Sequence, residues 1–142
     1  MVGYINRLWR VVIAALVISV AVSCGGRDLS HDPEAVDKVM VEYLLTDFGQ
    51  DIKAVNSNVS EINKVKLTRQ DANPIVIVDV VYKDGRSTRE LYGFSYKQVS
   101  AAVELLEENP KMTEQQLAES LSTSKIYAVA LKEIVRRAKN VK

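Results

Sequence analysis

The sequence predicts an α+β fold that has one N-terminal helix, a small antiparallel sheet of two or three strands, and three C-terminal helices. Three patterns support this prediction. After Asp32, apolar residues recur every three or four positions, as they do on one face of a helix. Residues 75–82 are almost continuously apolar and β-branched, which is typical of a buried strand. Helical spacing then returns between residues 96 and 139.

The composition is that of a globular protein with room for one domain, or one domain with an appendage. Of 142 residues, 47% are hydrophobic and 26% are charged, with a formal net charge of +1. This balance argues against a disordered chain and against the strong basicity of many nucleic-acid-binding proteins. A single cysteine excludes an internal disulfide, and a single histidine excludes a zinc site of the Cys/His type within one chain.

The first 23 residues have the pattern of a secretory signal peptide. Arg7 and Arg10 precede an uncharged, mainly apolar run at residues 11–23. As a helix this run would span roughly 20 Å, which is short against a hydrocarbon core of roughly 30 Å. Because positive charge stays on the cytoplasmic side, the part of the chain after the apolar run is predicted to be translocated to the other side of the membrane.

Residues 20–24, Val-Ala-Val-Ser-Cys, resemble the lipobox of bacterial lipoproteins, although Ala21 stands where that family most often has leucine. The resemblance implies cleavage between Ser23 and Cys24, a thioether-linked lipid on Cys24, and an acyl chain such as palmitate on the new N-terminus. Gly25 is not the aspartate associated with inner-membrane retention in enteric bacteria, which favours the outer membrane if the cell has one. The alternatives are a plain signal peptide beside an ordinary cysteine, or an uncleaved signal anchor.

These boundaries predict four segments. Residues 1–23 form the signal peptide, 24–31 a lipidated polar tether, 32–94 a helix with the small sheet, and 95–142 a three-helix unit that packs with the preceding segment as one domain. The mature chain is expected in the cell envelope, anchored by lipid and facing away from the cytoplasm.

The N-terminal helix is predicted to begin at Asp32-Pro33, because an N-cap acid followed by proline is a typical helix start. Gly49 is expected to end or kink it. The apolar face of this helix is formed by Val36, Met40, Tyr43, Leu44 and Phe48.

The predicted strands are 62–69, 75–82 and 87–94. The second is expected at the centre of the sheet with both faces covered, and Asp84-Gly85 favours a two-residue type I′ hairpin before the third. Asp79 interrupts the central strand. Because an isolated buried carboxylate is costly, Asp79 is a candidate functional residue; a satisfied structural role or an edge-facing position is the alternative.

The C-terminal helices are predicted from their stop and start signals. Asn109-Pro110 ends a helix that begins near Tyr96, and Thr113 with Gln116 forms a capping box for the next helix. Residues 122–124 form a short turn, and Ser124 is the expected cap of a third helix that runs to about Lys139.

Residues 96–139 resemble the helix-turn-helix unit of bacterial transcription regulators, in which the last helix reads DNA. The chain departs from that pattern at Ser122, where the turn usually has glycine, and at Ala128, where valine is usual. The matching residues are Thr113, Leu117, Ala118, Leu121, Ser124, Leu131 and Ile134.

The last predicted helix is basic, which makes it a candidate surface for contact with an anion or nucleic acid. The same charges also complement the dipole at a helix C-terminus. Topology weighs against DNA binding, because a helix behind a signal peptide faces no chromosome. The candidate contact residues are Lys125, Lys132, Arg136, Arg137 and Lys139.

No phosphate-binding glycine loop, nucleophile elbow or cluster of metal ligands occurs in the sequence, and the one histidine, His31, falls in the tether. We therefore expect no enzyme activity, metal or cofactor. The leading hypothesis is a non-catalytic lipoprotein that presents an interaction surface to a protein partner in the envelope. The alternative is a nucleic-acid-binding module for DNA uptake, transfer or phage exclusion, and a third hypothesis is a small-ligand carrier with a site between sheet and helices.

Overall fold

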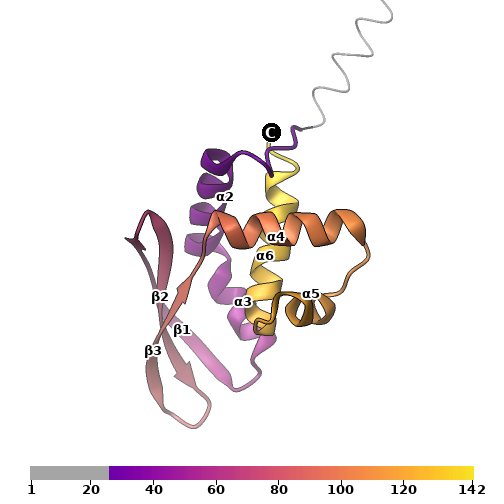
Figure 1. The fold of residues 1–142 in the computed structure, drawn as a ribbon. Coiled ribbons are helices and arrows are strands. Elements are labelled where there is room, and N and C mark those ends of the chain that lie inside the picture. The colour runs from indigo at the N-terminus through magenta and orange to yellow at the C-terminus, as the bar shows by residue number, and fades with distance from the viewer. Residues whose placement is uncertain (1–25) are drawn as a thin grey trace, which may run out of the picture.

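The computed structural model describes residues 26–142 (Figure 1). It confirms an α+β fold with a three-stranded antiparallel sheet. The prediction of a single helix before the sheet is wrong, because two helices precede it within the described residues. The elements are α2 (Pro33–Thr46), α3 (Phe48–Val55), β1 (Val59–Gln70), β2 (Asn73–Tyr82), β3 (Ser87–Gly93), α4 (Tyr96–Glu108), α5 (Glu114–Leu121) and α6 (Lys125–Ala138).

The break between the first two helices lies at Asp47, not at Gly49. The Asp47 backbone N–H donates to the Tyr43 carbonyl and closes α2, while the Asp47 carbonyl accepts from Gln50 and begins α3. Gly49 is therefore inside the first turn of α3. A Cβ at this position would lie 3.3 Å from Cγ2 of Ile62, so the glycine allows α3 to approach β1 closely.

The strand order is β1-β2-β3, as expected for two successive hairpins. The first hairpin turns through Asp71 and Ala72, which both have positive φ (51° and 68°). The predicted two-residue type I′ turn at Asp84-Gly85 is wrong: the Tyr82 N–H donates to the Arg86 carbonyl at 2.8 Å, which leaves a three-residue loop. A type I′ turn needs positive φ at two residues, and in this loop Gly85 alone provides it.

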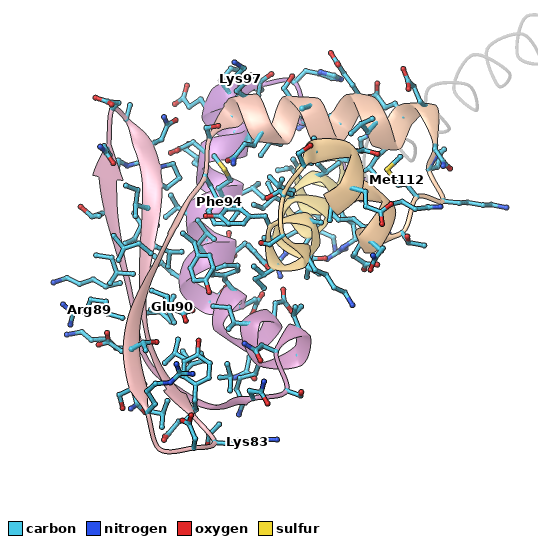
Figure 2. All side chains as sticks on the ribbon, turned by 60° about the horizontal axis from the view of Figure 1, so that its bottom comes forward. Lys83, Arg89, Glu90, Phe94, Lys97 and Met112 are labelled. Carbon is cyan, nitrogen blue, oxygen red and sulfur yellow. The ribbon has the colours of Figure 1, made fainter. Side chains whose placement is uncertain are left out.

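The inner face of the sheet packs on the helices through Val76, Val78 and Val80, which are buried. The alternate residues of β2 point the other way, where the structure from residue 26 onward places no helix (Figures 1 and 2). The prediction that the central strand is covered on both faces is therefore wrong. Strand residues alternate between the two faces of a sheet, so the almost continuous apolar run of β2 places apolar side chains on the outer face as well.

Helix α6 lies at the centre of the helical layer and packs against α2, α3, α4 and α5. Its buried residues include Ala128, Leu131 and Ile134. Within the described residues, none of the helices is long and apolar enough to cross a membrane. Aromatic rings join the sheet to this layer, with centroids 5.1 Å apart for Phe48 and Tyr92 and 5.6 Å apart for Phe48 and Phe94.

Residues 27–31 were predicted to be part of a tether, but this segment is hydrogen-bonded to the C-terminal end of α6 and the residues after it. Arg27 and Val141 exchange two backbone hydrogen bonds of 2.8 and 3.1 Å, and the Leu29 N–H donates to the Ala138 carbonyl at 2.8 Å. Ser30 is fully buried and donates to Asp28. This part of the predicted tether therefore belongs to the folded body. Cys24 lies outside the described residues.

Candidate interaction surfaces

The capping box and the short turn predicted around α5 are present. Thr113 Oγ1 accepts from the Gln116 N–H at 3.2 Å, and Gln116 Oε1 accepts from the Thr113 N–H at 3.0 Å, so the capping box is formed. Ser122 has left-handed backbone angles (φ 53°, ψ 46°), the conformation that favours the glycine usual at this position. Ser124 is the N-cap residue of α6, but its side chain makes no capping bond.

The start of α6, which would read bases, is mostly occupied by intramolecular packing. Tyr127 lies against Phe94, with centroids 5.1 Å apart, and its hydroxyl accepts from the Gly93 N–H at 3.2 Å. Ile126 is half-buried against the core, whereas Lys125 is exposed. A recognition helix contacts base edges with its N-terminal residues. In this part of α6, Lys125 is the one exposed side chain of the three.

Two of the candidate basic residues, Arg136 and Arg137, share the carboxylate of Glu133. Arg136 Nε donates to it at 3.1 Å and Arg137 Nε at 2.8 Å. The hydrogen bond from Arg136, followed by that from Arg137, holds the pKa of Glu133 below its usual value despite partial burial. Much of the positive charge at this end of α6 is therefore neutralised within the protein.

Arg137 also joins α6 to the junction of α2 and α3. Its Nη2 donates to the Asp47 carboxylate, and its guanidinium lies 5.1 Å from the centroid of the Tyr43 ring. The Tyr43 hydroxyl donates to Asp51. Burial, followed by this hydrogen bond, raises the pKa of Tyr43 above its usual value. We call Tyr43, Asp47, Asp51, Glu133 and Arg137 the Arg137 cluster, and its contacts give Arg137 a structural role.

Two of the three other predicted cations also have partners within the protein. Lys139 Nζ lies 3.5 Å from Glu107 Oε1, and Lys132 Nζ donates to the Met112 carbonyl at 2.8 Å. Among the residues from 26 onward, Lys125 is the one member of the predicted set with neither an ion pair nor a side-chain hydrogen bond.

One hollow of about 420 Å³ brings three of the predicted cations together. It lies among the helices rather than between the sheet and the helices, where the small-ligand hypothesis put its site. Acidic and apolar side chains share the hollow with the cations, so its electrostatic character is mixed. Its lining includes Lys132, Arg136, Lys139, Asp51, Glu114, Glu133, Leu106, Val129 and Val135.

Asp79 lies on the outer face of the sheet, not in the core. Its Oδ1 accepts from Arg89 Nε at 3.0 Å, and its side chain is 32% exposed. The hydrogen bond from Arg89 lowers the pKa of Asp79 below its usual value. The idea of an isolated buried carboxylate is therefore wrong, and the structure gives Asp79 a cross-strand ion pair instead.

The sequence reasoning missed the outer sheet face as a surface. Leu91 is 61% exposed there, more than Leu45 at 46%, the other large exposed hydrophobic among the described residues. The alternating lysines of β1 could have signalled a solvent-facing side. We call the following set the outer sheet face: Glu61, Lys64, Lys66, Thr68, Ile75, Ile77, Asp79, Val81, Ser87, Arg89, Leu91 and Gly93.

No protein-family model, curated protein or solved structure matches the chain. Within residues 26–142, no group of three or more His, Cys, Asp or Glu side chains is arranged to hold a metal ion.

Proposed function

We propose that the protein is a bacterial lipoprotein, cleaved before Cys24 and lipidated there, whose folded body is a non-catalytic interaction module of the cell envelope. The body would face away from the cytoplasm, in the outer membrane if the cell has one. Support for the anchor comes from the basic start, the short apolar run and the small residues before Cys24. Two or more acyl chains, each stabilised by about 0.8 kcal/mol per buried CH₂, would hold the protein firmly.

The observation that carries the interaction role is the outer sheet face. A sheet face with apolar side chains is normally buried against another layer. On this face Leu91 is exposed while Ile75 and Ile77 are half-buried, and helices occupy the opposite face of the sheet. An exposed apolar area with a polar rim is typical of a surface that binds another molecule.

The geometry of the N-terminal end supports a body held close to its anchor. Arg27 is the third residue after Cys24, so at most about 11 Å of extended chain would separate the lipidated residue from the folded body. Figure 1 shows the start of the described chain beside the C-terminus, at one end of the molecule, and the turn between β2 and β3 at the other. The lipid would therefore hold the first end near the headgroups and leave the β2–β3 turn pointing away.

We favour protein binding over nucleic-acid binding because the charges of α6 are engaged internally. Affinity for DNA depends on cations that are free to replace counterions at the phosphates. Arg136 and Arg137 instead share Glu133, and Lys139 lies beside Glu107. A salt-sensitive gel shift of duplex DNA by the purified protein at low ionic strength would support the nucleic-acid alternative against this proposal.

Metabolic labelling with an alkyne analogue of palmitate tests the proposed anchor. We expect label on the wild-type protein in the membrane fraction and none on Cys24→Ser. Ser23→Ala is the matched control: it changes the neighbouring residue but keeps it small, so labelling should persist. Wild-type protein found unlabelled in the soluble cytoplasmic fraction would overturn the proposal.

A further inference from the structure

We propose that the outer sheet face binds an amphipathic helix of a protein partner, with the apolar side of that helix on β2 and acidic residues opposite Lys64 and Lys66. This inference deepens the proposed function and rests on its premise that the partner is a protein. The bound helix would form a third layer, opposite the helices that already cover the inner face of the sheet.

The register of the strands places apolar and charged side chains in rows across this face. Lys66, Ile77 and Leu91 are directly paired neighbours on the three strands. The adjacent row consists of Lys64, Asp79 and Arg89. Arg89 points away from the helical layer in Figure 2, on the side of β3 opposite Glu90. The outer side of β2 is therefore apolar at Ile75, Ile77 and Val81 and acidic at Asp79, and cations flank it on both edge strands.

Two hollows lie along β2 on this face. The first, about 490 Å³, is lined by Val81 and Arg89 among others. The second, about 90 Å³, lies between Lys66 and Ile77. A third, about 370 Å³, lies at the end of the sheet, where Ile75 and Gly93 meet Phe94, Ser95 and Gln98. Gly93 adds no side chain there, and nothing lies within 4 Å of a Cβ built on it. The outer sheet face is therefore uneven, with separate hollows beside Val81 and Ile77.

The dimensions of the outer sheet face suit a helix. Residues two apart on a strand are about 7 Å apart, and residues four apart on a helix rise by about 6 Å. The distance from Ile75 to Val81 along the strand is about 20 Å, which corresponds to a helix of about thirteen residues. Helix residues at every fourth position would therefore meet Ile75, Ile77 and Val81, with the Asp79–Arg89 ion pair between the last two.

Charge indicates that the partner is acidic. Arg89 is already paired with Asp79 at 3.0 Å. Lys64 and Lys66 are exposed and form no ion pair within the described part of the chain. Carboxylates along one side of the bound helix would pair with these two lysines and fix its orientation, as charged rims do at protein interfaces.

Site-specific photo-cross-linking in whole cells tests the proposal with the full-length protein. A benzoylphenylalanine at position 91 should form an adduct with one protein, and mass spectrometry should map the adduct to an amphipathic helix that carries acidic residues. The same probe at Leu45, the exposed apolar residue of α2, is the matched control and should not form this adduct.

Charge reversal of the lysines then tests the chemistry of the surface. Lys64→Glu with Lys66→Glu should lower the adduct yield about tenfold, because like charges at an interface repel. Lys53→Glu with Lys111→Glu makes the same change in net charge elsewhere on the surface and should leave the yield unchanged. Unchanged circular dichroism would show that each variant is folded, and Leu91→Glu is a second disrupting variant if the first does not fold.

Five results would overturn the proposal: no adduct at position 91, equal adducts at positions 91 and 45, a dimer of this chain, a lipid adduct, or an adduct to a partner strand that pairs with the edge of the sheet. Palmitate labelling separates this failure from failure of the proposed function, because labelling of Cys24 does not depend on the outer sheet face.

Discussion

Arg137 donates a hydrogen bond to Asp47, a residue 90 positions earlier in the chain, and so joins α6 to the junction of α2 and α3. The same guanidinium bonds Glu133 and lies over the Tyr43 ring. Arg136, one residue earlier, also bonds Glu133 but points into solvent, with its side chain 62% exposed. Two adjacent arginines that the sequence placed in one candidate anion-binding set therefore have different surroundings.

Arg137→Ala should destabilise the protein by about 1–2 kcal/mol, because it removes a charge-assisted hydrogen bond, a shared ion pair and a cation–π contact. Arg136→Ala, its matched control, should cost less than about 0.5 kcal/mol, as is usual for exposed ion pairs. Urea denaturation followed by circular dichroism measures both free energies of unfolding. Equal costs for the two variants would contradict the structural role of Arg137.

Glycine at two turn positions should stabilise the fold. Ala72 and Ser122 both have positive φ, which costs an L-residue about 1 kcal/mol or more relative to an ordinary helical conformation. We expect Ala72→Gly and Ser122→Gly each to raise the free energy of unfolding by about 0.5–1 kcal/mol, after the larger unfolded-state entropy of glycine is subtracted.

Thermal unfolding measures this effect, and Ser122→Ala is the control, since it changes the side chain but keeps the backbone cost. A melting temperature that is lowered by both glycine substitutions would contradict the left-handed backbone at these turns.

The interaction of Glu133 with Arg136 and Arg137 should make the free energy of unfolding fall at acid pH. Arg136 and Arg137 lower the pKa of Glu133 in the folded state below the reference value of 4.5. The carboxylate therefore contributes stability above that value, and the contribution is lost as the pH falls through the lower, folded-state pKa. Glu133→Gln should show a smaller loss of stability than wild type between about pH 5 and pH 3. Denaturation across this range tests the claim, and parallel curves would disprove it.

Much of the secondary structure was predictable because its signals are local. Asp32 and Pro33 begin α2, and Thr113 with Gln116 caps α5, as short-range hydrogen-bonding rules require. The turn at Asp71 and Ala72 was not predictable in this way, because neither residue is a glycine or an asparagine. The pairing across the sheet imposes positive φ on both.

The surfaces were less predictable than the elements. In β2, residues on both faces are apolar, and a sequence pattern cannot tell a covered face from an uncovered one. The structure separates Val78, which is buried, from Ile77, which is half-buried beside the exposed Leu91. The basic residues of α6 were found correctly as a cluster in sequence. Their neutralisation by Glu133, Asp47 and Glu107 depends partly on contacts between distant segments.

Mass spectrometry of the mature N-terminus, on protein extracted from membranes with detergent, shows whether Cys24 is cleaved and lipidated. Trypsin cleaves after Arg27, so a lipid anchor on Cys24 predicts a short peptide from Cys24 to Arg27 that carries a diacylglyceryl thioether and an N-terminal acyl chain. An unmodified peptide from Val11 to Arg27, or a mature N-terminus at another residue, would contradict it.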